Sequence, residues 1–104
     1  MKYLVIARRN LVPMDPKTAI TMFQAAKQWE SAELASGKMD LRYNYADGSG
    51  GFGIVNGDSH EEVYDTLLES PYYVFMDWEV IPLVDWDHSL DKLVELMQKM
   101  AAMS

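Results

Sequence analysis

No cysteine occurs in the 104-residue sequence. This absence excludes disulfide bonds, thiolate metal sites and cysteine nucleophiles, and it fits a reducing compartment. The sequence also lacks an apolar run of about 18 residues, the length that a membrane-spanning helix needs. Arg8 and Arg9 follow the short apolar segment near the N-terminus, which argues against a secretion signal. We therefore expect a cytoplasmic protein without a membrane partner.

Basic residues are few. The sequence has nine Lys and Arg residues and 16 Asp and Glu residues, which gives a net charge of −7. The basic residues are scattered rather than gathered in a stripe, so we expect no nucleic-acid partner. By contrast, 49% of the residues are hydrophobic and three are tryptophan, which excludes a disordered chain. The length suits one domain.

The apolar spacing predicts alternating strands and helices. Asp15 before Pro16 indicates a helix start, Gly37 a helix end, and Ser59 with Glu62 a capping box. The predicted elements are a strand over 3–9, a helix over 16–34, strands over 39–45 and 52–56, a helix over 60–70, a strand over 74–84 and a tail helix capped by Asp87 or Ser89.

This order, βαββαβ plus a helix, is typical of an α+β, ferredoxin-like fold with a four-stranded antiparallel sheet. Its two helices cover one sheet face and leave the other bare. We expect a homodimer that packs sheet against sheet as a dimeric α+β barrel. Residues 1–87 form the domain, and the helix over 88–104 packs on that domain or on a neighbouring subunit.

Residues 66–83, TLLESPYYVFMDWEVIPL, resemble the muconolactone isomerase family of the dimeric α+β barrel group. The similarity lies in Thr66-Leu67-Leu68, Pro71, Met76-Asp77, Glu79-Val80 and Leu83, and extends weakly to Met14-Asp15-Pro16 and Gly37. It implies a pocket between sheet and helices, proton transfer beside a lactone carbonyl, and no metal or cofactor. It also implies a barrel that can build larger rings. The second strand, Asp40-Leu41-Arg42-Tyr43, lacks the histidine of that family, which argues against muconolactone itself as substrate.

Asp77 and Glu79 are candidate catalytic residues. They stand two apart on a predicted strand, so their carboxylates share one face, as an acid and base pair requires. The alternative is that Arg8, Arg9 or Arg42 forms an ion pair with them on a partly solvent-exposed sheet face.

Strand two supplies candidate substrate-binding residues. Arg42 can hold a carboxylate through two donors, or belong to a solvated strand edge. Alternation places Tyr43 and Tyr45 with Leu41 on the opposite side, where hydroxyls under the helices can donate to a developing enolate. Ordinary core tyrosines are the alternative.

The two histidines differ in context. His88 stands beside Asp87 after the last strand, where strand ends border pockets, so it is a further catalytic candidate. The alternative is a helix-entry residue. His60, in the first turn of a helix, is interpreted as a surface histidine. Neither histidine has the spacing of a nucleophilic or metal site.

The segment GSGGFG, residues 48–53, matches a dinucleotide-binding pattern. A strand, not a helix, is predicted after it, so we interpret these glycines as a hairpin turn with no cofactor. The sequence leaves three hypotheses: a cofactor-independent isomerase of a small unsaturated carboxylated or lactone metabolite, a non-catalytic dimeric ligand-binding or assembly module, and a cofactor-free monooxygenase.

Overall fold

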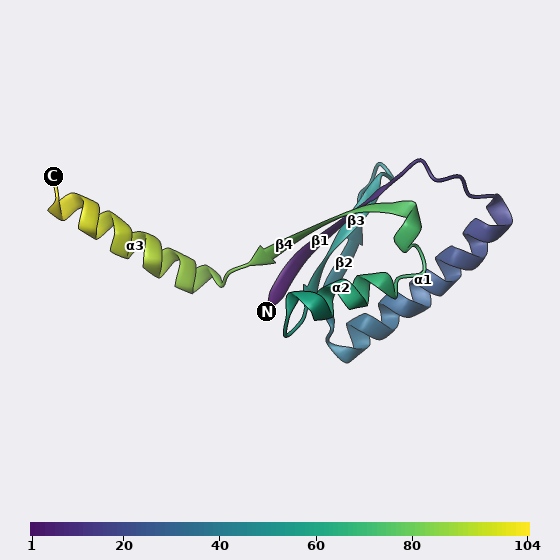
Figure 1. The fold of residues 1–104 in the computed structure, drawn as a ribbon, viewed down its shortest axis with the longest axis horizontal. Helices are drawn as coiled ribbons and strands as arrows, with labels where there is room; N and C mark the ends of the chain where they lie inside the picture. Colours follow the sequence, from purple (N-terminus) through teal and green to yellow (C-terminus); the bar gives the residue numbers. More distant parts are fainter.

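A four-stranded antiparallel sheet in the order β2-β3-β1-β4 forms the centre of the computed structural model, which describes residues 1–104 (Figure 1). The elements are β1 (Lys2–Arg9), α1 (Pro16–Ser36), β2 (Met39–Asn44), β3 (Gly50–Asn56), α2 (His60–Leu68), the 3₁₀ helix η1 (Tyr73–Phe75), β4 (Met76–Leu83) and α3 (Trp86–Ala102). The predicted ferredoxin-like α+β fold with an extra C-terminal helix is confirmed. Pro82 lies in β4, an edge strand, as proline in a sheet requires.

The first two helices begin at their predicted caps, and α1 also ends at its predicted cap. The Asp15 carboxylate accepts a hydrogen bond from Thr18 N at 2.9 Å, and Gly37 ends α1 with φ 81°. The Ser59 hydroxyl accepts from Glu62 N at 3.1 Å and starts α2. Each side chain satisfies a backbone donor that the helix itself leaves unpaired.

The tail helix begins earlier than predicted. Asp85, rather than Asp87 or Ser89, is the N-cap of α3, and its carboxylate accepts from His88 N at 3.2 Å. The helix therefore begins at Trp86 and includes Asp87 and Ser89. Because β4 ends at Leu83, Asp85 is the first residue with a capping side chain after the strand.

The core lies between one sheet face and the two helices α1 and α2. Six buried residues from β1, β2, β3 and α2 form its main cluster: Tyr3, Val5, Met39, Val55, Val63 and Leu67. A second cluster joins Met22 and Ala26 of α1 to Tyr72. Residues of opposite parity, such as Leu4 and Ile6 of β1, face the other side, which no element of the chain covers. This open face also carries Leu41, Ile81 and Leu83, all partly exposed.

A β-bulge reverses the alternation expected for β2. The β2–β3 register shifts between Met39 and Leu41, so Met39 is buried under the helices while Leu41 and Tyr43 face the open side. Arg42 then points toward the helices. A one-residue shift moves every later side chain to the other face.

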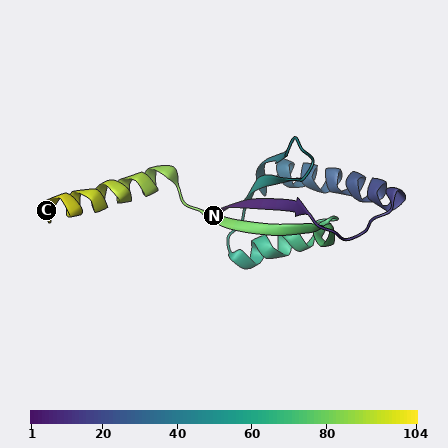
Figure 2. The ribbon, with the colours of Figure 1, turned by 90° about the horizontal axis from the view of Figure 1, so that it is seen from above.

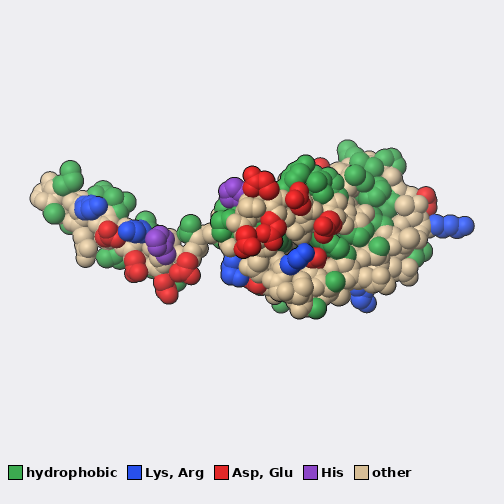
Figure 3. All heavy atoms as spheres, turned by 60° about the horizontal axis from the view of Figure 1, so that its bottom comes forward, with side chains coloured by type: hydrophobic (Ala, Val, Ile, Leu, Met, Phe, Trp, Pro, Cys, Tyr) green, Lys and Arg blue, Asp and Glu red, His purple; other side chains and the backbone are tan.

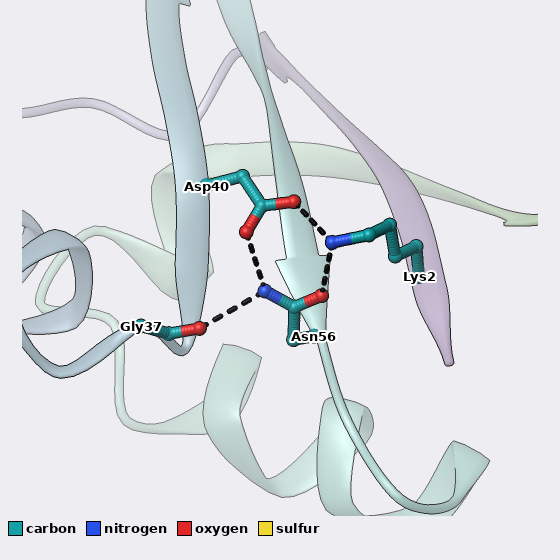
Figure 4. Close-up of polar contacts among 4 residues, drawn as sticks. All are labelled: Lys2, Gly37, Asp40 and Asn56. Atoms are coloured by element: carbon teal, nitrogen blue, oxygen red, sulfur yellow. Dashed lines mark hydrogen bonds and ion pairs between the residues drawn. The ribbon is translucent and has the colours of Figure 1, made fainter.

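A polar network at Asp40 surrounds the bulge (Figure 4). Lys2 Nζ donates to Asp40 Oδ2 at 2.5 Å, and Asn56 Nδ2 donates to Asp40 Oδ1 at 2.7 Å and to Gly37 O at 2.9 Å. The hydrogen bond from Lys2, followed by that from Asn56, lowers the pKa of Asp40. The network links the starts of β1 and β2 to the end of β3.

The glycine-rich segment is a hairpin turn, as predicted. Gly48 has φ 75°, and β3 begins at Gly50, two residues before the predicted strand. A Cβ on Gly50 would lie 2.0 Å from Ala7 O, so only glycine fits beside β1. No helix N-terminus follows the turn, which excludes the dinucleotide geometry.

The C-terminal helix extends away from the domain (Figures 1 and 2). No residue of α3 is buried, and the molecule measures 65 Å along its longest axis. Its apolar stripe, Leu90, Leu93, Val94, Met97 and Met100, is therefore uncovered. Within one chain α3 does not pack on the domain. No helix of the structure has both the length and the apolar character needed to cross a membrane.

Candidate functional site

A cavity of about 480 Å³ lies between α1, β2 and the β2–β3 hairpin. Phe23, Ala26, Leu34 and Met76 give it apolar walls, while Arg9, Lys27, Glu30 and Arg42 supply charges. Its size is that of cavities that enclose small organic ligands. Gly48 and Gly50 of the hairpin complete its wall.

Glu30, Arg42 and Tyr72 form the polar centre of the cavity. Arg42 Nε lies 3.0 Å from Glu30 Oε1, and the Tyr72 hydroxyl donates to the same oxygen. The two charged side chains are only 15% and 18% exposed, so water screens their attraction weakly. The Tyr72 hydroxyl donates to Oε1, and no hydrogen bond of the chain reaches the second carboxylate oxygen, Oε2.

Surrounding side chains fix this geometry. Asn44 Oδ1 accepts from Arg42 Nη2 at 3.2 Å, and the Arg42 guanidinium lies 5.8 Å from the Tyr72 ring centroid. Trp78 stacks on the Tyr72 ring with 5.6 Å between centroids, and Trp78 Nε1 donates to Tyr73 O at 2.9 Å. The phenol and the guanidinium therefore have little freedom to turn away from Glu30.

Burial raises the pKa of the Tyr72 phenol, and the Glu30 carboxylate that it donates to raises the pKa further. The positive charge of Arg42 opposes this shift. Tyr72 therefore stays protonated at neutral pH and acts as a hydrogen-bond donor.

Tyr72→Phe should make the free energy of unfolding fall less steeply as the pH rises into the alkaline range. In the unfolded chain the phenol ionises near its ordinary pKa of 10.0, whereas in the folded chain it holds its proton to higher pH. Its contribution is therefore complete below that value and decreases as the pH rises above it. At pH 7 the variant should lose about 1.5–3 kcal/mol from the missing bond to Glu30. Urea unfolding from about pH 7 to about pH 11 measures both effects. Tyr64→Phe, at an exposed tyrosine of α2, is the control, and an equal flattening there would contradict the assignment.

The sequence profile of a domain of unknown function, DUF3303, matches residues 1–101. The chain belongs to this family. A search of curated proteins finds no match.

Two solved structures are similar in fold. Muconolactone isomerase shares 24% identity over 82% of this chain and 90% of its own, with a TM-score of 0.74. The 5-chloro-2-hydroxyhydroquinone dehydrochlorinase of Burkholderia phenoliruptrix AC1100, in complex with 2,5-dihydroxybenzoquinone, shares 16% identity over 85% and 98%, with a TM-score of 0.67. The resemblance predicted from residues 66–83 is confirmed for this DUF3303 chain at the level of fold.

Among the candidate catalytic and substrate-binding residues predicted from the sequence, only Arg42 lines the cavity. Asp77 and Glu79 share one face, as expected, but it is the open face, because they pair in register with Arg8 and Ile6. Arg8 Nη1 lies 3.3 Å from Glu79 Oε2, which agrees with the ion-pair alternative. Their catalytic role stays a prediction, separate from the cavity.

Tyr43 and Tyr45 also lie outside the cavity. Both rings sit 6.1 Å from the Phe52 ring, and Phe52 belongs to the open face. The expectation that their hydroxyls line a pocket under the helices is wrong, because the bulge at Asp40 turns this part of β2 over.

Neither histidine lines the cavity. His88 is an exposed residue in the first turn of α3, beyond the end of the domain. His60 Nδ1 is 2.7 Å from the hydroxyl of the buried Tyr3, so its ring also holds the start of β1. No group of three His, Asp or Glu side chains is placed to hold a metal ion.

Glu30 and Tyr72 were not identified from the sequence. One signal was present: Glu30 follows Ala26 by four residues, so it continues the face of α1 that buries Met22 and Ala26. A carboxylate on a buried helix face needs a partner. Tyr72 gave no comparable signal, because the adjacent Pro71 and Tyr73 predict only a turn before the strand.

Proposed function

We propose that this chain is a cofactor-independent enzyme that moves a proton on a small unsaturated, carboxylated or lactone metabolite. The observation that carries the proposal is the juxtaposition in one cavity of the Glu30 carboxylate, the Arg42 guanidinium and the Tyr72 phenol. A positioned base beside a cationic hydrogen-bond donor is an arrangement that speeds proton transfer next to a carbonyl.

The three residues have separate roles in this proposal. Glu30 Oε2 takes the proton from a carbon next to the carbonyl, so a C–H bond breaks and an O–H bond forms. Electron density moves to the carbonyl oxygen, where the Arg42 guanidinium stabilises the developing enolate. The Tyr72 hydroxyl, which donates to Glu30 Oε1, holds the carboxylate in position. Glu30 then returns the proton at a different carbon of the conjugated system. The isomer leaves with the atoms of the substrate, and no oxidant or reductant is consumed.

The fold similarities support the same class of chemistry. By name, the two similar structures are an isomerase and a dehydrochlorinase, and one of them holds a small quinone. The apolar walls formed by Phe23, Leu34 and Met76 suit the carbon skeleton of such a molecule.

Proton exchange tests the proposal directly. The protein in D₂O is incubated with unsaturated lactones and unsaturated carboxylic acids, and ¹H NMR follows the loss of signal at carbons next to the carbonyl. Exchange faster than in buffer, and slower with Arg42→Gln, supports the proposal. A compound that binds in the cavity yet exchanges only at the buffer rate contradicts it and favours the non-catalytic ligand-binding module.

We also propose that two copies pair through their open sheet faces. The apolar residues Leu4, Ile6 and Ile54 lie there without cover, and such a face is usually buried by a second molecule. Light scattering at micromolar concentration should give about twice the chain mass of 11.9 kDa. Ile54→Lys should give monomer, because it places a charge in the interface. Val74→Lys, in the exposed η1 turn, is the control. A monomeric wild-type protein would contradict the pairing.

A further inference from the structure

The charges of the cavity differ in sign from those of the chain. Three of the nine basic residues line it, namely Arg9, Lys27 and Arg42, but only one of the 16 acidic residues, Glu30. Figure 3 shows several acidic side chains grouped on the outer surface of one face of the domain. A cationic cavity in an acidic protein concentrates anionic ligands.

Two of these three cations have no partner. Arg42 is paired with Glu30 at 3.0 Å, whereas neither Arg9 nor Lys27 takes part in any of the ion pairs of the chain. The negative charge of Glu30 and the positive charge of Arg42 therefore neutralise each other within the protein. Two positive charges remain for a ligand to neutralise.

Arg9 and Lys27 reach the cavity from different walls. Arg9 ends β1, and its backbone is fixed by hydrogen bonding to Ser49 O at 2.9 Å. In β1 the alternate residues Tyr3, Val5 and Ala7 face the helices, and Arg9 continues this series. Arg8 faces the open side. Lys27 comes from α1 across the cavity. The apolar side chains Phe23 and Met76 line the same cavity; Met76 pairs in register with Arg9, and Phe23 lies one turn before Lys27 on α1.

We infer that the ligand of this cavity is a small dianion: a short carbon skeleton with two carboxylates, or one with a phosphomonoester, neutralised by Arg9 and Lys27. The inference rests on the proposed function for the site and adds to it the charge of the ligand. A monoanion or a neutral lactone would leave one or both cations unmatched. A dianion matches both and places its carbon atoms against the apolar walls, next to Glu30.

Binding isotherms test this class without relying on catalysis. The probes are maleate and glutarate as dicarboxylates, glycerol 3-phosphate as phosphomonoester, and monomethyl maleate and glycerate as monoanionic counterparts. We expect at least one dianion to bind tenfold or more tightly than its counterpart, with an affinity that falls as salt is added. The probe that binds distinguishes a dicarboxylate from a phosphate ligand. Equal affinity for dianion and monoanion, or no binding by any dianion, would overturn the inference.

Adjacent residues provide matched controls. Arg9→Gln and Lys27→Gln should each weaken dianion binding by about tenfold, as loss of one charged contact does. Arg8→Gln removes the same charge one residue away on the opposite sheet face, and Lys17→Gln removes a charge from α1 outside the cavity; both should bind as the wild type does. If the controls weaken binding equally, the effect is one of net charge and the inference is wrong.

Glu30→Gln tests the two proposals separately. We expect this variant to bind dianions but to lose proton exchange, which agrees with both the ligand class and the role of Glu30. Dianion binding with wild-type exchange in Glu30→Gln would overturn the proposed chemistry alone.

Discussion

Glu30→Gln should slow proton transfer by about 10²–10⁴-fold, the usual contribution of a positioned acid or base. The amide keeps the size of the side chain and an oxygen that can accept from Tyr72 beside Arg42, so the cavity keeps its shape. What the variant loses is a group that can take a proton from carbon. The rate of deuterium exchange, measured by NMR on a substrate found with the wild type, gives the effect.

Two variants control for the loss of an acid elsewhere. Glu33→Gln changes another buried carboxylate of α1 that does not line the cavity. The double variant Asp77→Asn, Glu79→Gln removes the acidic pair of the open face. We expect both to retain exchange within a few-fold of the wild type. If the open-face pair proved essential and Glu30 dispensable, the reaction would take place between two sheets and not under the helices.

Local rules explain why so much of the fold was predictable. The caps Asp15, Gly37 and Ser59 lie at the helix ends that they specify, because each satisfies a neighbouring backbone group or adopts a local conformation. The chain order of strands and helices then leaves few topologies, of which the split βαβ arrangement is a common one.

The main error in the strands has a specific cause. Residues 39–45 alternate in sequence, but the bulge at Asp40 adds one residue to the strand. This bulge is held by Lys2 and Asn56, which lie 38 and 16 residues away in the chain. No pattern within β2 reveals such partners, so the alternation alone predicts Arg42 on the solvent side and the tyrosines in the pocket.

The candidate site was less predictable for the same physical reason. Glu30 and Tyr72 are separated by 42 residues, and only folding brings the phenol to the carboxylate. The spacing of Asp77 and Glu79, by contrast, can be read directly from the sequence of one strand. Spacing within a strand fixes a shared face but does not say which face the helices cover.

Gly50→Ala should destabilise the fold by roughly 3 kcal/mol or more, in the range of severe overpacking. Its Cβ would lie 2.0 Å from Ala7 O and 2.9 Å from Arg8 Cα, and both are backbone atoms of the central strand β1. Neither can move without breaking the pairing of β1 with β3. Urea unfolding, monitored by the tryptophan fluorescence of the folded chain, measures the change.

Gly48→Ala is the matched control within the same hairpin. A Cβ there meets nothing within 4 Å, so the only penalty is the left-handed backbone at φ +75°, about 1–2 kcal/mol. The difference between the two variants thus separates steric exclusion from backbone conformation. If Gly50→Ala and Gly48→Ala lost the same free energy of unfolding, the close approach of the hairpin to β1 would not explain the need for glycine at position 50. If Gly50→Ala folds with only a small loss, the hairpin must shift away from β1, and because Gly50 lines the cavity with Arg9, ligand affinity should then change as well.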